Sequence, residues 1–249
     1  MTAKSTPMRL DALLVERGLA DSIAKAQAMI LAGEVSVDGV RADKAGTRFP
    51  EEARIEVTSR AGKYVSRGGL KLEGALEDFA VDPTARVCLD IGSSTGGFTD
   101  CLLQRGAARV YAVDVNVDQL AWKLRQDNRV IRMSRNARDL RPTDIPEPID
   151  LVAIDVSFIS VSKVLPSAIA AARTGTDLLI LVKPQFELPR QDVSSGGIVV
   201  DPALHQKALT TVREASIKLG LEIVGASPSR LRGAEGNQEY FLHARKPLR

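Results

Sequence analysis

Short apolar segments alternate with helical segments from residue 87 to residue 182, and this alternation limits the fold more than any other feature of the chain. The segments expected as strands are 87–91, 109–114, 130–133, 149–155 and 177–182, and those expected as helices are 66–79, 97–105, 117–125, 161–172 and 201–219. Such alternation predicts an α/β fold with a doubly wound, Rossmann-like sheet that is mostly parallel. Two late strands, 221–226 and 239–244, have no helix between them, which predicts an antiparallel edge strand.

The first 60 residues follow a different pattern. Helical spacing of apolar residues predicts helices at 9–17 and 21–32, and the alternating segment 34–37 is expected to be a strand. Asp38-Gly39 is a turn sequence typical of a two-residue β-hairpin, and a further strand is expected at 55–57. These elements predict a small α+β unit that is separate from the larger sheet.

The chain of 249 residues is long enough for one large domain and one small one. We expect the small domain at 1–59, a linker at 60–65 and the large domain at 66–249. Hydrophobic residues make up 44% of the chain and charged residues 26%, the balance of a globular protein with a sizeable core. Cys88 and Cys101 lack the paired spacing of a zinc site or a disulfide framework, so we expect no bound metal and a reducing compartment.

The sequence also predicts where the protein works. The longest strongly apolar stretch towards the C-terminus, 178–182, is far shorter than the roughly 20 residues that span a bilayer. Residues 1–8 lack the apolar region of a signal peptide. We therefore expect a cytoplasmic protein without a membrane partner, and the net charge of +3 with a pI near 8.9 is a weak indication of nucleic acid.

A glycine-rich turn follows the first strand of the larger domain. It consists of Asp90, Ile91, Gly92, Ser93, Ser94, Thr95, Gly96, Gly97 and Phe98. Glycines permit a tight turn and a close approach to a ligand, and in an open α/β sheet such a turn lies at the ligand crevice. This one matches neither G-x-G-x-x-G nor a phosphate loop, and it offers no Lys or Arg to a pyrophosphate. The acidic residue that opens it suits a ligand that carries an ammonium and a sulfonium.

A second carboxylate, Asp114, ends the next strand 24 residues after Asp90. At this position an acid can accept hydrogen bonds from both hydroxyls of a ribose. Two acids around a glycine-rich turn indicate S-adenosylmethionine as the cofactor and a methyltransferase as the class of enzyme. A nucleotide-binding variant of the same fold, or glycines that serve only a tight turn, are the alternatives that these residues leave open.

Five motifs occur along the chain in a fixed order. They are Ser-Arg-Gly-Gly-Leu-Lys-Leu at 66–72, the turn at 90–98, Asp-Val-Ser-Phe-Ile at 155–159, Leu-Val-Lys-Pro-Gln-Phe at 181–186, and Glu239. Together they resemble the TlyA family, bacterial rRNA 2′-O-methyltransferases that act on cytidine and were historically labelled hemolysins. The resemblance spans nearly the whole chain. It implies a catalytic domain similar to the FtsJ (RrmJ) methyltransferases and an N-terminal domain similar to the αL-motif RNA-binding domain of a small-subunit ribosomal protein.

The resemblance implies a catalytic Lys–Asp–Lys–Glu tetrad, whose members here are Lys71, Asp155, Lys183 and Glu239. A ribose hydroxyl is a poor nucleophile and must lose its proton as it attacks the methyl carbon. A buried lysine beside another cation can be shifted toward its neutral form and act as the base, and we expect this of Lys183. Asp155 would hold it in line, Lys71 would lower its proton affinity and position the ribose, and Glu239 would fix the geometry from the antiparallel edge strand.

The resemblance also implies the remaining contacts. Asn136, Ala137 and Asp139, after the third strand, are expected near the adenine of the cofactor. The residues expected to contact RNA are Arg9, Lys25, Arg41, Arg67 and Phe186. Phe186 either stacks on the target base or packs in the core. Ile23 stands where the αL motif usually has an arginine, so one phosphate contact is expected to be missing.

The expected partners are ribosomal RNA and the ribosomal subunits, and the sequence leaves the oligomeric state open, a monomer included. A membrane-active hemolysin is one alternative, but it would need a membrane segment, a signal or a disulfide framework. A non-catalytic RNA-binding protein is another, and an intact tetrad argues against it. A base N-methyltransferase would carry Asn/Asp-Pro-Pro-aromatic where this chain has Asp155-Val-Ser-Phe158.

Overall fold

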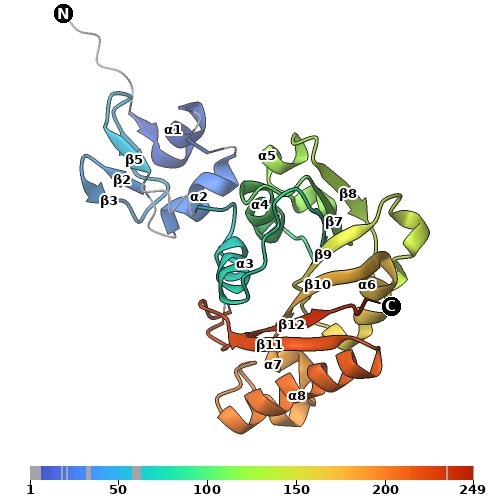
Figure 1. The fold of residues 1–249 in the computed structure, drawn as a ribbon. Helices are drawn as coiled ribbons and strands as arrows, with labels where there is room; N and C mark the ends of the chain where they lie inside the picture. Colours follow the sequence, from blue (N-terminus) through green and yellow to red (C-terminus); the bar gives the residue numbers. More distant parts are fainter. Residues whose placement is uncertain are drawn as a thin grey trace, which may run out of the picture. The chain divides into compact units, whose positions relative to one another are not determined.

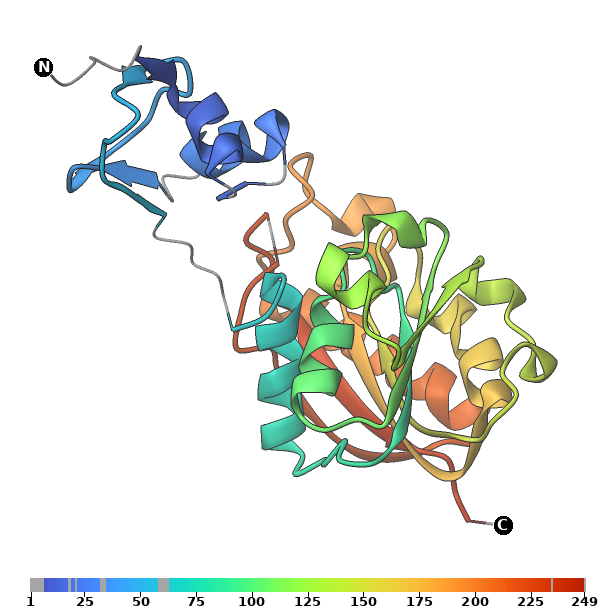
Figure 2. The ribbon, with the colours of Figure 1, turned by 90° about the horizontal axis from the view of Figure 1, so that it is seen from above.

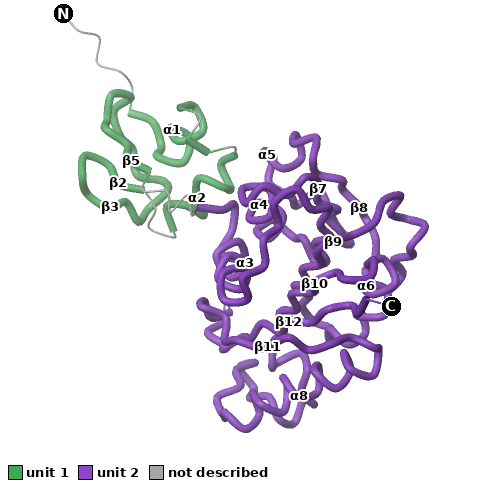
Figure 3. Tube along the Cα trace, viewed as in Figure 1, with its two compact units in different colours: residues 1–62 green, residues 63–249 purple. Residues whose placement is uncertain are grey.

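The computed structural model divides the chain into two compact units, residues 1–62 and residues 63–249 (Figures 1 and 3). The structure describes residues 7–17, 19–20, 22–31, 35–57, 63–233 and 235–248. Residues 60–62 of the expected linker lie outside the described residues. Each unit has its own hydrophobic core.

The first unit packs two helices against short strands. Its elements are β1 (Met8–Arg9), α1 (Leu10–Glu16), α2 (Ile23–Leu31), β2 (Val35–Val37), β3 (Val40–Arg41), β4 (Arg48–Phe49) and β5 (Ile55–Val57). β3, β2 and β5 form one antiparallel sheet, and β1 pairs with β4. Asp38 and Gly39 both have positive φ, at 51° and 81°, as a tight hairpin between Val37 and Val40 requires. The predicted hairpin is confirmed.

A seven-stranded sheet forms the centre of the second unit. Its strands are β6 (Val87–Ile91), β7 (Arg109–Asp114), β8 (Val130–Ser134), β9 (Ile149–Ile154), β10 (Ala172–Val182), β11 (Glu222–Pro228) and β12 (Tyr240–Arg245). They lie in the order β11-β12-β10-β9-β6-β7-β8. From β10 to β8 all neighbours are parallel, whereas β12 is antiparallel to both of its neighbours. The predicted doubly wound, mostly parallel sheet is confirmed.

The prediction of an antiparallel edge strand is wrong in one respect, because β12 is inserted between β10 and β11. The edge strand is β11, which runs in the same direction as β10. Burial follows this placement. Four consecutive residues of β12 are buried, as in a strand covered on both faces, while β11 alternates between exposed and half-buried residues.

Helices cover both faces of this sheet (Figure 2). α3 (Arg67–Asp78), α4 (Gly97–Gln104) and α5 (Trp122–Arg125) share one core cluster with the sheet, and α6 (Leu165–Ala171) and α8 (Pro202–Lys218) share the other. The shorter elements are α7 (Pro184–Glu187) and the 3-10 turns η1 (Val117–Gln119), η2 (Ala137–Asp139), η3 (Pro142–Asp144), η4 (Val161–Lys163) and η5 (Arg190–Asp192). The layers match those expected for a doubly wound fold.

Two expected helices are broken. The helix expected at 117–125 is split into η1 and α5, because the chain is extended at Leu120 and Ala121 N–H donates to the carbonyl of Thr95. The helix expected at 161–172 begins as the turn η4, and α6 then starts with Pro166 in its first turn, where a missing N–H is tolerated. The first break ties α5 directly to the glycine-rich turn.

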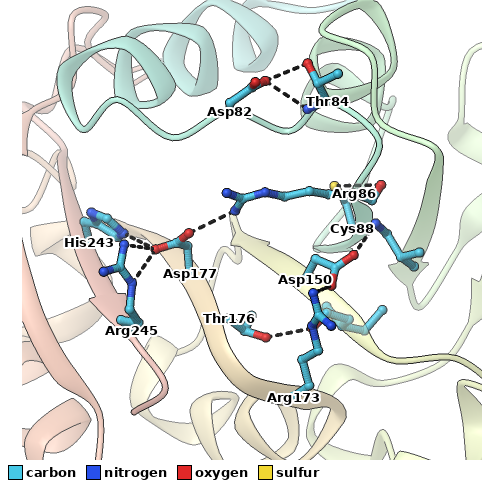
Figure 4. Close-up of polar contacts among 12 residues, drawn as sticks. Asp82, Thr84, Arg86, Cys88, Asp150, Arg173, Thr176, Asp177, His243 and Arg245 are labelled. Atoms are coloured by element: carbon cyan, nitrogen blue, oxygen red, sulfur yellow. Dashed lines mark hydrogen bonds and ion pairs between the residues drawn. The ribbon is translucent and has the colours of Figure 1, made fainter. Parts of the chain in front are cut away.

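A network of charged side chains joins the starts of the parallel strands (Figure 4). Asp177 on β10 accepts hydrogen bonds from Arg86 and Arg245 and from Nε2 of His243 at 2.8–3.0 Å. Burial alone would raise the pKa of Asp177, but these three donors outweigh it and hold that pKa well below its usual range. The network therefore fixes β6, β10 and β12 to one another at the sheet edge opposite their site-bearing ends.

Candidate active site

The glycine-rich turn between β6 and α4 packs against two other segments. A Cβ at Gly92, where φ is +85°, would lie 2.1 Å from the carbonyl oxygen of Asp155. A Cβ at Gly97 would lie 2.2 Å from Oγ of Ser66, at the start of α3. Both distances are impossible for a real side chain, so these positions need glycine. The turn is thereby packed against the end of β9 and the beginning of α3.

Asp90 ends up fully buried beneath this turn. Its Oδ2 accepts a 2.6 Å hydrogen bond from Oγ1 of Thr99, while Oδ1 is buried without a partner among the described residues. Burial raises the pKa of Asp90 to about 7. Oγ of Ser93 is also buried without a partner in the described part of the chain. Unpartnered buried polar atoms are rare in proteins, and two of them at one turn indicate groups that await a ligand.

Asp114 lies at the end of β7 and orders the neighbouring loops. Its carboxylate accepts hydrogen bonds from the amides of Ser94 at 2.9 Å and Asn116 at 3.1 Å. The next residue, Val115, has 70% of its surface exposed. The side chain of Asn136 caps η2 by accepting from the amide of Arg138, and Ala137 is half-buried beside the exposed Asp139. All of these residues follow the carboxyl ends of β7 and β8, where the sheet topology predicts a ligand.

The four tetrad residues form two lysine–carboxylate pairs. Nζ of Lys71, on α3, lies 2.5 Å from Oε2 of Glu239. Nζ of Lys183, after β10, lies 2.5 Å from Oδ1 of Asp155, after β9, and donates to Oγ of Ser157 at 2.8 Å. Because β12 is antiparallel, its beginning meets the carboxyl ends of β9 and β10, and this brings Glu239 to the same sheet edge. Both lysines are buried, and they are paired with carboxylates 168 and 28 residues away in sequence.

A cavity of about 180 Å³ joins one member of each pair to the glycine-rich turn. Its lining residues are Ser66, Arg67, Gly68, Lys71, Gly92, Ser93, Ser94, Thr95, Gly97, Phe98, Asp155 and Arg232. Lys183 and Glu239 do not line it, but each contacts a residue that does. The structure thus brings together three of the motifs that the sequence singled out as catalytic or cofactor-binding.

A second pocket lies beside the Lys183–Asp155 pair and contains an aromatic residue that was not predicted as a site residue from the sequence. Phe158 is 91% exposed and has a φ of +64°, which is rare for an aromatic residue. Its ring lies 5.3 Å from the ring of Phe186, at an angle of 52°. Arg138 and Lys163 contribute positive charge to the same pocket. Exposure and strained backbone are tertiary properties, so only the motif around Asp155 could have pointed to Phe158.

The residues expected to contact RNA differ in their exposure and in their hydrogen-bond partners. Lys25 and Arg41 are exposed on the first unit, and Ile23 is 44% exposed at the position that usually carries arginine. The guanidinium of Arg9 forms a 2.7 Å ion pair with the buried Asp11, which occupies part of its hydrogen-bonding capacity. Arg67 is exposed at the cavity.

No group of three or more His, Cys, Asp or Glu side chains in the described ranges could hold a metal ion. Nor does any helix there combine the length and the apolar character needed to cross a membrane.

Comparison with known proteins covers both units. Residues 64–246 match the FtsJ-like methyltransferases, and residues 8–55 match the S4 domain. The 16S/23S rRNA (cytidine-2′-O)-methyltransferase TlyA of Mycobacterium tuberculosis is 47% identical over 239 residues, 95% of this chain and 89% of that protein. Hemolysin A of Brachyspira hyodysenteriae is 43% identical over 238 residues, 95% of this chain and 99% of that protein.

Two solved structures are also similar to this chain. A protein described as a hemolysin from Streptococcus thermophilus is 40% identical, with a TM-score of 0.76 over 97% of this chain and 89% of that one. An S-adenosylmethionine-dependent methyltransferase from Listeria monocytogenes, 15% identical with a TM-score of 0.54 over 74% of this chain and 100% of that one, shares the fold. With the geometry of the tetrad and the turn, these matches show that the chain belongs to the TlyA family of FtsJ-like methyltransferases.

Proposed function

We propose that this protein transfers a methyl group from S-adenosylmethionine to the ribose 2′-hydroxyl of a cytidine in ribosomal RNA, in the cytoplasm. The observation that carries the proposal is the pair of buried lysine–carboxylate contacts at one sheet edge, beside a glycine-rich turn. Such a set suits an acceptor whose proton must be removed during transfer. The family relatives named for rRNA cytidine methylation support the choice of acceptor.

The residues around the turn fit S-adenosylmethionine, which when bound supplies an electrophilic methyl group. Asp90 and Ser93 provide free polar atoms at the turn, and Asp114 stands at the end of β7, where it can accept from ribose hydroxyls. The exposed Val115 offers an apolar face to the adenine, and η2, with Asn136 and Asp139, offers polar groups. Because none of the turn's side chains is cationic, it favours a positively charged ligand over a pyrophosphate.

One ion pair removes the proton of the ribose hydroxyl, and the other positions the ribose. Lys183 takes up the hydroxyl proton as the oxygen attacks, and its amine must first give up one of its own protons, for which Asp155 is the adjacent acceptor. Ser157 holds the same amine through a 2.8 Å hydrogen bond. Lys71 positions the ribose from α3, and Glu239 holds Lys71 in place. Much of the acceleration comes from the alignment of the hydroxyl with the methyl donor.

The aromatic pair Phe158 and Phe186, beside the tetrad, is the proposed binding site of the target base. Phe158 and Phe186 present ring surfaces at the edge where Asp155 and Lys183 lie. Stacking of a base on an aromatic ring contributes about 1–3 kcal/mol in single-stranded RNA recognition. A nucleotide unstacked from its neighbours could seat its base there and present its ribose to Lys183. The S4 domain, with Lys25 and Arg41 exposed, supplies RNA contacts outside the catalytic unit.

Transfer of labelled methyl groups to unmodified ribosomal subunits tests the proposal. Lys183→Ala should lower kcat by roughly 100- to 10,000-fold, because it removes the base, while the affinity for the cofactor measured by calorimetry stays the same. Lys207→Ala is the matched control, since Lys207 also pairs with a carboxylate, Asp192, but outside the site. The label should appear as 2′-O-methylcytidine.

Other outcomes are equally clear. A Lys183→Ala enzyme with the full rate would remove Lys183 from the chemistry. Cofactor binding without transfer to subunits, free rRNA or tRNA would overturn the rRNA assignment and favour a binding-only role.

A further inference from the structure

The cavity at the glycine-rich turn carries more positive charge than the tetrad accounts for. Lys71 and Asp155 each have a partner of opposite charge, but Arg67 and Arg232 also line the cavity. Within the described part of the chain, neither arginine forms an ion pair with a carboxylate. Both are exposed. Two guanidinium groups without a carboxylate partner are therefore available at one cavity to an anion from outside the chain.

The local backbone adds to this charge. The first turn of α3 (Ser66, Arg67 and Gly68) and the first turn of α4 (Gly97 and Phe98) line the same cavity. The N-terminus of a helix carries a partial positive charge and free N–H groups. An independent observation is Oγ of Ser93, which is buried, lines the cavity and has no partner among the described residues. Its hydroxyl group is free to donate a hydrogen bond to a ligand.

Arg232 is held at the cavity by a braced loop between β11 and β12. Nη2 of Arg67 donates to the carbonyl of Arg232 at 3.0 Å, and Nη1 of Arg232 donates to the carbonyl of Gly236 at 3.1 Å. The amide of Gly233 donates to the carbonyl of Asn237 at 2.8 Å, which closes the turn. Carbonyl contacts orient both guanidinium groups without neutralising them, so most of their capacity to bind an anion remains.

We propose that Arg232, together with Arg67, forms an oxyanion subsite at the mouth of the active-site cavity. The proposal rests on the proposed function, in which two reactants bring an oxyanion to this place. One is the methionine carboxylate of S-adenosylmethionine, and the other is the phosphodiester beside the target ribose. An arginine fork binds either group through paired hydrogen bonds. Arg232 is thus a binding residue contributed by the β11–β12 loop, far in sequence from the glycine-rich turn.

Binding measurements on full-length protein distinguish the two anions. Titration of S-adenosylmethionine and S-adenosylhomocysteine into the Arg232→Ala variant gives the cofactor arm, and the KM for unmodified ribosomal subunits gives the RNA arm. Loss of a charged hydrogen bond predicts a change of about 10- to 100-fold in one of the two. Arg213→Ala is the control, because Arg213 is exposed on α8 and likewise has no carboxylate partner among the described residues.

Each outcome has one meaning. A weaker Kd for both cofactor forms at constant KM for RNA assigns the subsite to the carboxylate, and the reverse assigns it to the phosphodiester. Arg232→Lys should recover part of the loss, because it restores the charge. If Arg232→Ala equals the wild type in both arms, or if both arms weaken and Arg232→Lys restores neither, the subsite is refuted. A wild-type protein that binds no S-adenosylmethionine would instead refute the proposed function itself.

Discussion

At the scale of one residue, the buried carboxyl group of Asp90 lowers the stability of the fold beneath the glycine-rich turn. A fully buried carboxyl group with only one hydrogen-bonded oxygen is costly for the fold. Burial, the dominant cause, raises the pKa of Asp90 to about 7. An acid whose pKa is higher in the folded than in the unfolded state binds its proton more tightly when folded, so its ionisation near neutral pH lowers the free energy of unfolding. A positively charged ligand would offset that cost.

Binding of the cofactor is expected to release protons from Asp90. Near pH 6.5 a fraction of Asp90 is protonated, and binding of a cationic cofactor beside it should lower its pKa and release protons. Calorimetry of S-adenosylmethionine binding in buffers of different ionisation enthalpy measures the number released. Asp90→Asn should abolish the release and should also remove the decline of the free energy of unfolding between about pH 4 and pH 7. Equal proton release by the variant would show that another group titrates.

The family resemblance predicted the four residues of the proposed tetrad, whereas much of their surroundings could not be predicted. Lys71, Asp155, Lys183 and Glu239 stand in motifs, and the structure brings them together as two pairs. The resemblance already placed Asp155 beside Lys183, whereas the pairing of Glu239 with Lys71 depends on where β12 enters the sheet and could not be predicted from the sequence. Arg232 belongs to no motif and becomes visible only through the cavity that it lines.

At the scale of elements, β12 contributes residues both to the proposed active site and to the charged network that stabilises the opposite end of the sheet. Its beginning carries Glu239 to the site, and its end carries His243 and Arg245 to Asp177 (Figure 4). Four consecutive buried residues show that it is an inner strand, whereas the sequence predicted only an antiparallel edge strand from the two late strands that have no helix between them. The break in the helix expected at 117–125 could not be predicted from the local sequence either, because it depends on a tertiary contact with Thr95.

Loss of the Asp177 charge should destabilise this end of the sheet. Asp177→Asn removes the negative charge that two arginines and one histidine share, and loss of hydrogen bonds to a charged group costs about 1.5–3 kcal/mol in the free energy of unfolding. Because the pKa of Asp177 is held below its usual range, its contribution is present above about pH 4 and is lost as the pH falls through the lowered pKa. The difference between variant and wild type should therefore shrink in acid.

Denaturant unfolding at pH 7 and pH 3 measures this difference. Asp192→Asn is the control, since its partner Lys207 is half exposed and such surface pairs contribute about 1 kcal/mol or less. A constant difference across this pH range would contradict the role assigned to the Asp177 charge.

At the scale of the molecule, each unit has its own core. The first unit packs around Leu10, Leu14, Ile30 and Val35, and the second around two clusters on the faces of its sheet. The composition and the change of pattern near residue 60 predicted two domains, and the units divide after residue 62. The placement of their boundary to the residue depends on packing, because Tyr64 is buried in the second unit, where Gly69 leaves room for its ring.

Separate cores predict separable tasks. A fragment of residues 63–249 should unfold cooperatively and bind S-adenosylmethionine as the whole chain does, because the turn, Asp114 and the cavity all lie within it. Its KM for ribosomal subunits should rise, since the exposed cations of the S4 domain are absent. Calorimetry and methyl-transfer kinetics on the fragment and the whole chain check both points. Unchanged kinetics on subunits would remove the S4 domain from substrate binding.

The late position of β12 in the chain also affects the order in which the parts of the protein can fold during synthesis. Chains emerge from the ribosome with the N-terminus first, and domains fold as units. The S4 domain precedes the catalytic unit in the chain, whereas Glu239 lies at the start of β12, the last strand of the described sheet to be synthesised. The small unit can therefore fold on the nascent chain before β12 has been made, so the proposed tetrad is among the last parts of the protein to be completed.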